Sequence, residues 1–464
     1  MLELLLARYG LTDASLLCID AKPHILKSGQ ADGIQPRTME VLKSLGISDE
    51  IENEACQMWE FAFWKPSDDK AKVIERTSVV PEVIPPARFK YEATIHQGRI
   101  ERILETDLLR YSGRGVLRNT KLLHMQLDEN DTEFPVLAET ETDGVKRLIR
   151  TKYLVGADGA HSVVRRCMGL TLDGESLDHI WGVIDLVIDT DFPDIRRRCA
   201  IHSPAGSIMV IPRERIVTGD YLTRLYVQVP GLVDQKGDLI DEEAFKVPRS
   251  GRDLRAKVTL EGILQQATNA FRPYSIRPKH HDSIDWWAAY QIGQRVSPKF
   301  IVKDSQGIDR PVIHIPSPKG GQGMNVSMMD SYNLAWKLAY HINGISPMID
   351  NLTPLLDTYQ VERQSNAHIL IDFDRKFSAM FSGEMDIGAE HTYKEFRETF
   401  STGNGFTSGC GVEYPESMVV VRDSPDNATS PVHGTNYLLG VLRPGRRLLN
   451  VMLERHADGW RRDI

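Results

Sequence analysis

Apolar side chains recur at helical spacing in five stretches of the chain. In residues 1–10, leucines and a tyrosine fall at i, i+3, i+4 and i+7, and Gly10 stands where a C-terminal cap belongs. In the second stretch, Pro36 occupies the first helical position, which proline favours. The pattern predicts helices over 1–10, 35–47, 97–109, 331–342 and 354–381.

Short apolar runs between these stretches are typical of strands. SLLCIDA, 15–21, predicts a buried parallel strand that ends at Asp20. A helix followed by a strand ending in an acid is the second half of a dinucleotide-binding βαβ unit, in which the acid accepts hydrogen bonds from the adenosine ribose. KYLVGADGA, 152–160, predicts another buried strand that meets a glycine-bearing turn.

From about 178 to 300 the pattern becomes that of an antiparallel sheet. The runs WGVIDLVIDT, GSIMVIP, RLYVQVP and WWAAYQIG are separated by charged turns, and we expect one solvated face. Together the elements predict an α/β fold, in which a doubly wound, Rossmann-like sheet carries an inserted antiparallel β domain.

Composition narrows the classes of function. The 464 residues carry a net charge of −8, which disfavours a nucleic-acid partner, because phosphate binding needs a concentrated basic face. No run of about 18 apolar residues suits a membrane span, and the N-terminus lacks signal-peptide features. The five cysteines are scattered, which indicates a reducing compartment and by default the cytosol. Neither His280-His281 nor His314 has metal-site spacing, so we expect no metal.

The strongest motif is GADGAHSVVRR, 156–166, directly after an apolar strand. Its small residues would let the main chain approach a pyrophosphate, and Asp158 could accept hydrogen bonds from a ribose. Ser162 is placed to cap the helix that follows. An ordinary strand-turn-helix with a glycine-rich turn is the alternative.

A second glycine-rich segment, SPKGGQGMN, covers 317–325. Gly320, Gly321 and Gly323 allow close backbone approach just before a helix N-terminus. Its N–H groups and positive dipole end suit the electron-rich edge of a reduced flavin. The alternative is a glycine-rich loop without function.

A third segment, GQADGIQPRT, covers 29–38 and follows the first predicted strand. It places the carboxylate of Asp32 between two glycines and beside Arg37. Taken in isolation, a plain turn is the alternative.

These segments, with Gln97 and WWAAYQIGQRV, resemble the group A flavoprotein aromatic hydroxylases, and among them the phenol 2-monooxygenase branch. The resemblance spans most of 1–381 and rests on GQADGIQPRT, YLVGADGAHSVVR, SPKGGQGMN, DSYNLAWKLA and TYQVERQSNAHILIDFDRKFS. It implies an FAD-dependent monooxygenase that hydroxylates a phenolic or other aromatic small-molecule substrate with NADPH and O2 through a flavin hydroperoxide. Simple phenols and larger polyketide-like phenols both stay open as substrates. A homodimer is typical of the family.

The resemblance also implies roles for single residues. Asp32 and Tyr290 would activate the phenol, because loss of its proton raises the electron density of the ring. For Tyr290 the alternative is sheet packing with Trp286 and Trp287. The implied cofactor-binding residues are Asp20 at the adenosine ribose, Arg37 and Gln97 along the ribityl-pyrophosphate stretch, Asp158 at the pyrophosphate, the backbone of Gly323, Met324 and Asn325 at the flavin ring, and Arg295 near the flavin or nicotinamide.

The resemblance divides the chain into five parts. We expect 1–177 and 301–385 to form the FAD-binding domain, with the substrate-binding sheet at 178–300 between them. A linker is expected at 386–427, followed at 428–464 by the start of a truncated thioredoxin-like domain.

Two FAD-binding devices of the family are missing from this sequence. The chain is expected to begin just past the first strand and its G-x-G-x-x-G turn. Where the family has a Gly-Asp pair at a strand end, Arg310, Pro311 and Val312 stand. Two alternatives therefore stay open: a degenerate, non-catalytic homologue that pairs with another protein, and a flavin oxidase or dehydrogenase on the same fold.

Overall fold

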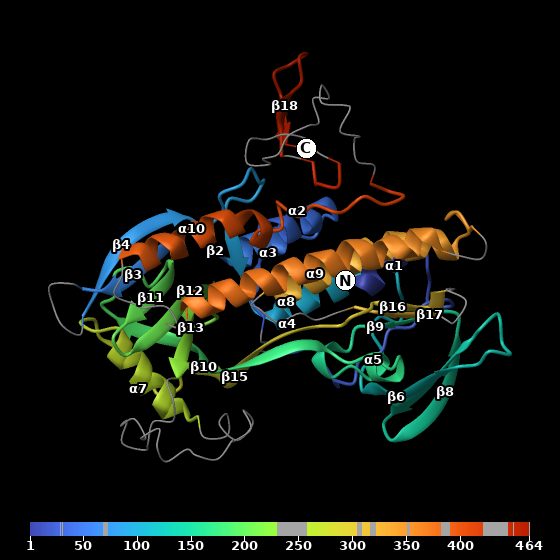
Figure 1. Ribbon diagram of the computed structural model, residues 1–464, viewed down its shortest axis with the longest axis horizontal. Helices are drawn as coiled ribbons and strands as arrows, with labels where there is room; N and C mark the ends of the chain where they lie inside the picture. Colours follow the sequence, from blue (N-terminus) through green and yellow to red (C-terminus); the bar gives the residue numbers. More distant parts are fainter. Residues whose placement is uncertain are drawn as a thin grey trace.

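A computed structural model describes most of the chain (Figure 1). The described residues are 1–27, 29, 31–67, 73–229, 258–303, 309–315, 322–349, 353–381, 390–420, 444–448 and 450–463. Gly320 and Gly321 lie outside them.

A large sheet forms one end of the molecule (Figure 1). Its strand order is β14-β10-β13-β12-β11-β3-β4, and β15 also pairs with β10. Every run that predicted an antiparallel strand lies in this sheet, so that prediction is confirmed. The strands are β3 (Glu60–Pro66), β4 (Ile74–Pro81), β10 (Asp173–Thr190), β11 (Arg198–Ser203), β12 (Gly206–Arg215), β13 (Tyr221–Val229), β14 (Ile276–Pro278) and β15 (Ile284–Val296).

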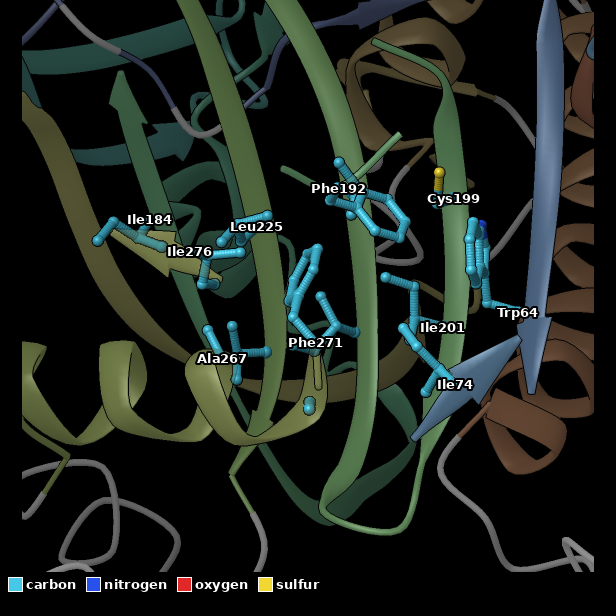
Figure 2. Packing of buried hydrophobic residues seen from close by; sticks show 14 of the residues in the cluster. Trp64, Ile74, Ile184, Phe192, Cys199, Ile201, Leu225, Ala267, Phe271 and Ile276 are labelled. Atoms are coloured by element: carbon cyan, nitrogen blue, oxygen red, sulfur yellow. The ribbon is translucent and has the colours of Figure 1, made fainter. Parts of the chain in front are cut away.

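One face of the large sheet packs against helix α7 (Leu260–Ala270). Figure 2 shows this apolar core, in which Phe271 and Phe192 lie between the helix and the strands. Ile201 of β11 and Leu225 of β13 contribute from the sheet. Alternate residues of each strand point to one face, so this core uses only half of the strand positions.

The opposite face turns toward the rest of the chain and toward α9 (Pro354–Phe381) and α10 (Glu390–Thr407). Met380 and Phe400 of these helices pack on Phe61 and Phe63 of β3. In Figure 1, α7 and α10 lie on opposite sides of the sheet.

The second part of the molecule carries the parallel strands. β9 (Leu154–Gly156) runs parallel to β17 (Asp309–His314), and β16 (Ile301–Lys303) pairs antiparallel with β17. Helix α5 (Val163–Cys167) follows β9. In its first turn, the backbone N–H of Arg165 donates a hydrogen bond to the Ser162 hydroxyl over 2.9 Å, which confirms the predicted cap.

Long helices pack beside these strands. α8 (Gly323–Ile342) contacts α9 and α1 (Leu2–Arg8), and buried ion pairs join α8 to α9. Lys337 lies 2.6 Å from Glu362, and Arg363 lies 2.5 Å from Asp330. All five predicted helices are confirmed, including α2 (Pro36–Ser44) and α4 (Gln97–Leu108).

Smaller elements complete the described part. They are α3 (Asp49–Glu54), the sheet of β1 (Gly33–Ile34), β5 (Glu92–Thr94) and β2 (Cys56–Met58), the sheet of β6 (Thr120–Leu127), β7 (Val136–Thr142) and β8 (Val145–Thr151), and the hairpin of β18 (Met452–Glu454) and β19 (Arg461–Asp463).

The structure differs from the sequence prediction at two segments. The expected strand at 15–21 forms only one parallel bridge, from Ile19 to Leu117, and Leu17 is 40% exposed rather than buried. The expected linker at 386–427 includes α10, because Phe400 and Asn404 bury apolar and amide groups against the sheet side. The domain boundaries and the thioredoxin-like assignment of the tail stay predictions.

Candidate active site

The loop before α2 is the point where the predicted flavin residues converge. Gln97 accepts a hydrogen bond at Oε1 from the N–H of Ala31, over 3.3 Å. Asn325 accepts at Oδ1 from the N–H of Gln35 and donates from Nδ2 to the Gly33 carbonyl, both over 2.9 Å. The first turns of α4 and α8 are therefore both tied to the loop that carries Asp32.

Gly29 explains why this loop contains a glycine at its start. A Cβ there would overlap the side chain of Gln97. The Gly29 carbonyl also accepts a hydrogen bond from the guanidinium of Arg224 over 3.1 Å. A larger residue would push Gln97 away from the loop.

The second face of the large sheet is buried and charged, so the expected solvated face is wrong here. Arg213 and Arg224 are fully buried, and Asp185 is almost so. The guanidinium of Arg224 lies 2.6 Å from Oδ1 of Asp185, and that of Arg213 lies 3.1 Å from Oδ2. The loop that carries Asp32 covers these polar positions where the prediction placed water.

Asp32 reaches into this charged cluster from the loop. Its Oδ2 lies 3.3 Å from Nη1 of Arg213 and 3.3 Å from Nη1 of Arg224. Glu214 pairs with Arg213 over 2.9 Å. Three carboxylates (Asp32, Asp185, Glu214) thus face two guanidiniums, which gives the cluster a formal charge of 2 − 3 = −1.

Two tyrosines share this face with the cluster. Tyr226 stands opposite Val183, and Tyr290 stands opposite Trp181, so both point to the same side of β10. Burial raises the pKa of Tyr290 to about 12, although Arg224 opposes the shift. Burial also raises the pKa of Tyr226. The Arg224 guanidinium opposes this shift, and the charge of Asp32 adds to it.

The Tyr290 hydroxyl is buried and has no hydrogen-bond partner among the described residues. Its ring lies 6.2 Å from that of Trp286, and the Arg224 guanidinium stacks over Trp286 at 5.4 Å. Tyr290 therefore does pack in the sheet, and it also carries an oxygen that a ligand could satisfy. Tyr226 is the tyrosine whose pKa responds to Asp32.

Sequence reasoning missed five residues of this site: Arg213, Arg224, Asp185, Glu214 and Tyr226. A signal was present, because the runs GSIMVIPRER and YLTRLYVQV interrupt apolar alternation with arginines. Charged residues are ordinary on a strand face that is expected to meet water, so the sequence alone does not mark them as site residues. Their burial becomes visible only when the loop that carries Asp32 is seen to cover them.

Asp158 and His314 lie close together at the ends of β9 and β17. The Asp158 carboxylate accepts hydrogen bonds from the Ser162 hydroxyl and from the N–H groups of Val163 and Val164, so it caps α5. Burial lowers the pKa of His314 to about 4. Its buried Nδ1 has no hydrogen-bond partner in the described part of the chain.

The remaining predicted cofactor residues are paired with other side chains or lie on other elements. Asp20 pairs with Arg118 over 3.0 Å and with Lys22. Arg37 sits at the start of α2, 3.3 Å from Glu40. Arg295 is exposed on β15. The structure thus joins Asp32, Gln97 and Asn325 by a common loop. The roles of the other residues stay predictions.

Comparison with known proteins decides the family. A family model described as an FAD binding domain matches residues 1–374. The flavin-dependent oxygenase ucdD of Aspergillus ustus is 35% identical over 474 residues, which cover 100% of this chain and 69% of that protein. The phenol 2-monooxygenase fsqG of Aspergillus fumigatus is 35% identical over 95% of this chain and 67% of its own length. The chain belongs to the FAD-dependent aromatic monooxygenases.

A solved structure supports the fold of this monooxygenase. Aklavinone-11 hydroxylase, crystallised with FAD and aklavinone, superposes with a TM-score of 0.68 over 100% of this chain and 78% of its own, at 22% identity. The predicted α/β fold is therefore confirmed. No described helix has both the length and the apolar character that a membrane crossing needs.

The residues present fit an FAD at three places. The first N–H groups of α8, from Gly323 onward, have no intrahelical partners and point beyond the helix. At the second place, Gly29 leaves room for Gln97, whose side chain the loop holds through the N–H of Ala31. The orphan Nδ1 of His314 offers a buried polar group near Asp158.

Proposed function

We propose that this monooxygenase hydroxylates an uncharged phenolic ring, using NADPH and O2. The balanced reaction is phenol + NADPH + H⁺ + O2 → dihydroxyarene + NADP⁺ + H2O. One observation carries the proposal: the buried carboxylate of Asp32 is held 3.3 Å from two guanidiniums on a face that also bears Tyr226 and Tyr290.

Asp32 is the proposed acceptor of the phenolic proton. Taking up that proton changes the formal charge of its cluster from −1 to 0 and moves the negative charge to the phenolate oxygen. Arg213 and Arg224 hold the carboxylate in place. A tyrosine hydroxyl at the substrate oxygen, from Tyr290 as implied by the family or from Tyr226, orients the phenol.

The cofactor would be held by residues on both sides of this cluster. FAD, reduced by NADPH, supplies the activated oxygen. We assign its binding to Gln97 and to the backbone of Gly323, Met324 and Asn325, with support from Asp20, Arg37, Asp158 and Arg295. The chain's own groups place the ring, control the proton and exclude water.

The test is a product assay on purified chain loaded with FAD. A panel of simple and polyketide-like phenols is incubated with NADPH and isotopically labelled O2, and the products are analysed by mass spectrometry. We expect one labelled oxygen atom per product and NADPH consumption that matches product. NADPH oxidation that yields only peroxide with every phenol would contradict the proposal and favour an oxidase.

A further inference from the structure

A second buried group of charges, formed by Arg198, Glu82 and Glu92, lies beside the proposed active site. The proposed reaction does not use these three residues. Arg198 of β11 contacts two glutamates through one nitrogen, Nη1, which lies 2.6 Å from Oε1 of Glu82 and 2.9 Å from Oε2 of Glu92. Glu82 is 4% exposed, Glu92 is 8% exposed, and the side chain of Arg198 is 17% exposed. Oε2 of Glu82 is buried and has no hydrogen-bond partner among the described residues.

Two carboxylates on one guanidinium cannot both be ionised cheaply away from water. A single cation balances one negative charge, and the second adds repulsion in a medium that screens it poorly. Burial raises the pKa of Glu82 to about 8, and the charge of Glu92 adds to the shift while Arg198 opposes it. Burial also raises the pKa of Glu92.

The group lies next to the loop that carries Asp32. The Glu92 carboxylate occupies the space where a Cβ of Gly33 would stand. After burial and Arg198, the charge of Asp32 is the next cause that acts on the pKa of Glu92. The pKa of Glu92 therefore responds to the charge of the proposed base.

Arg198 connects the group to the charged face of the sheet. Its guanidinium lies 4.9 Å above the ring of Phe61, and its Nη2 lies 3.9 Å from Sδ of Met209, the residue opposite Tyr226. Burial acts to lower the pKa of Arg198, but Glu82, Glu92 and, more weakly, Tyr226 outweigh it, so that the pKa is raised.

We propose that Glu82 and Glu92, which both pair with Arg198, hold one proton between their two carboxylates. They act as positioning residues that keep the surroundings of Asp32 and Tyr226 neutral while the phenol is deprotonated. This inference rests on the proposed function. With the shared proton, the triad has a charge of 1 − 1 = 0. Without it, the triad is −1, and the extra charge disfavours a phenolate beside Asp32.

The shared proton can be observed directly by infrared difference spectroscopy of the FAD-loaded enzyme between pH 6 and pH 10. We expect a protonated carboxyl band that disappears with a midpoint near pH 8. Glu82→Gln should remove the band, because glutamine keeps the shape of the protonated acid without titrating. Glu60→Gln is the matched control, since Glu60 forms an exposed pair with Arg197 on the same sheet and should leave the band intact. No titrating band in the wild type, or one that survives in Glu82→Gln, would overturn the shared proton.

The positioning role is tested by the pH dependence of kcat/KM with the phenol that is best hydroxylated. In the wild type we expect kcat/KM to fall above pH 8 by about tenfold per pH unit. In Glu82→Gln the profile should stay flat between pH 7 and pH 9, and Glu60→Gln should follow the wild type. An unchanged alkaline limb in Glu82→Gln would overturn the role and leave the proposed function standing. A titrating carboxyl band in an enzyme that forms no hydroxylated product would overturn the proposed function and leave the shared proton standing.

Discussion

Both faces of the large sheet are buried, but they are buried by different chemistry. The α7 face packs Phe271, Phe192 and Ile201 into an apolar core. The opposite face buries Arg213, Arg224 and Asp185 beneath the loop that carries Asp32. The same strands supply both, because successive residues point to opposite sides.

The difference separates what stabilises the domain from what does its chemistry. Burying apolar area is favourable at about 25 cal/mol per Å², so the α7 face stabilises the sheet. A buried ion-pair cluster returns little net free energy, because desolvating its charges offsets their attraction. The charged face therefore contributes little to the stability of the sheet, although its charges must be desolvated. We expect such a face to serve the protein's chemistry.

The largest expected effect comes from Asp32→Asn. It removes the proposed base while keeping the side-chain shape, so kcat with a phenol should fall by about 10²–10⁴-fold. Steady-state product formation measures the change. Asp189→Asn, at an exposed carboxylate on β10 paired with Arg277, is the control and should retain the wild-type rate. An equal loss in both variants would contradict a special role for the charged face.

On the α7 face the matching change is Phe271→Ala. The ring is fully buried, so we expect the free energy of unfolding to fall by about 3–5 kcal/mol, measured by urea denaturation. Val217→Ala, at a fully exposed position between β12 and β13, should change it by less than about 0.5 kcal/mol. At a temperature where Phe271→Ala remains folded, its kcat should stay near that of the wild type. A large loss of kcat there would show that the faces are not separable.

The two faces also differ in how far the sequence predicts them. Alternation placed the four antiparallel runs correctly, although the expected strand at 15–21 forms only one bridge. The spacing of apolar residues gave α9 its limits, because local periodicity sets both strands and helices. The family resemblance pointed to Asp32, since the 29–38 segment taken in isolation is equally typical of a plain turn. Arg213 and Arg224 were not predicted, because their burial depends on a loop almost 200 residues away in the sequence.

A smaller effect is expected from His202, on the charged face opposite Ser207. Burial lowers its pKa to about 4, so the folded state resists protonation that the unfolded chain accepts near pH 6.5. The stability is therefore present above pH 6.5 and is lost as pH falls toward 4, by about 2 kcal/mol at pH 5. His202→Gln should remove this acid-dependent loss in thermal unfolding between pH 7.5 and pH 5. An identical pH dependence in both proteins would contradict it.

The smallest effect offers the most direct comparison, because one substitution can be made on each face. Val227 of β13 lies in the α7 core, whereas Val183 of β10 lies opposite Tyr226 on the charged face, and both are buried. Valine to threonine keeps the volume and adds a hydroxyl. In the apolar core that hydroxyl lacks an acceptor, so Val227→Thr should lower the free energy of unfolding by about 2 kcal/mol. Beside polar groups the cost is partly recovered, so Val183→Thr should lose about 1 kcal/mol or less. Urea denaturation of the two variants measures the difference, and equal losses would mean that the second face is apolar in its energetics despite its charges.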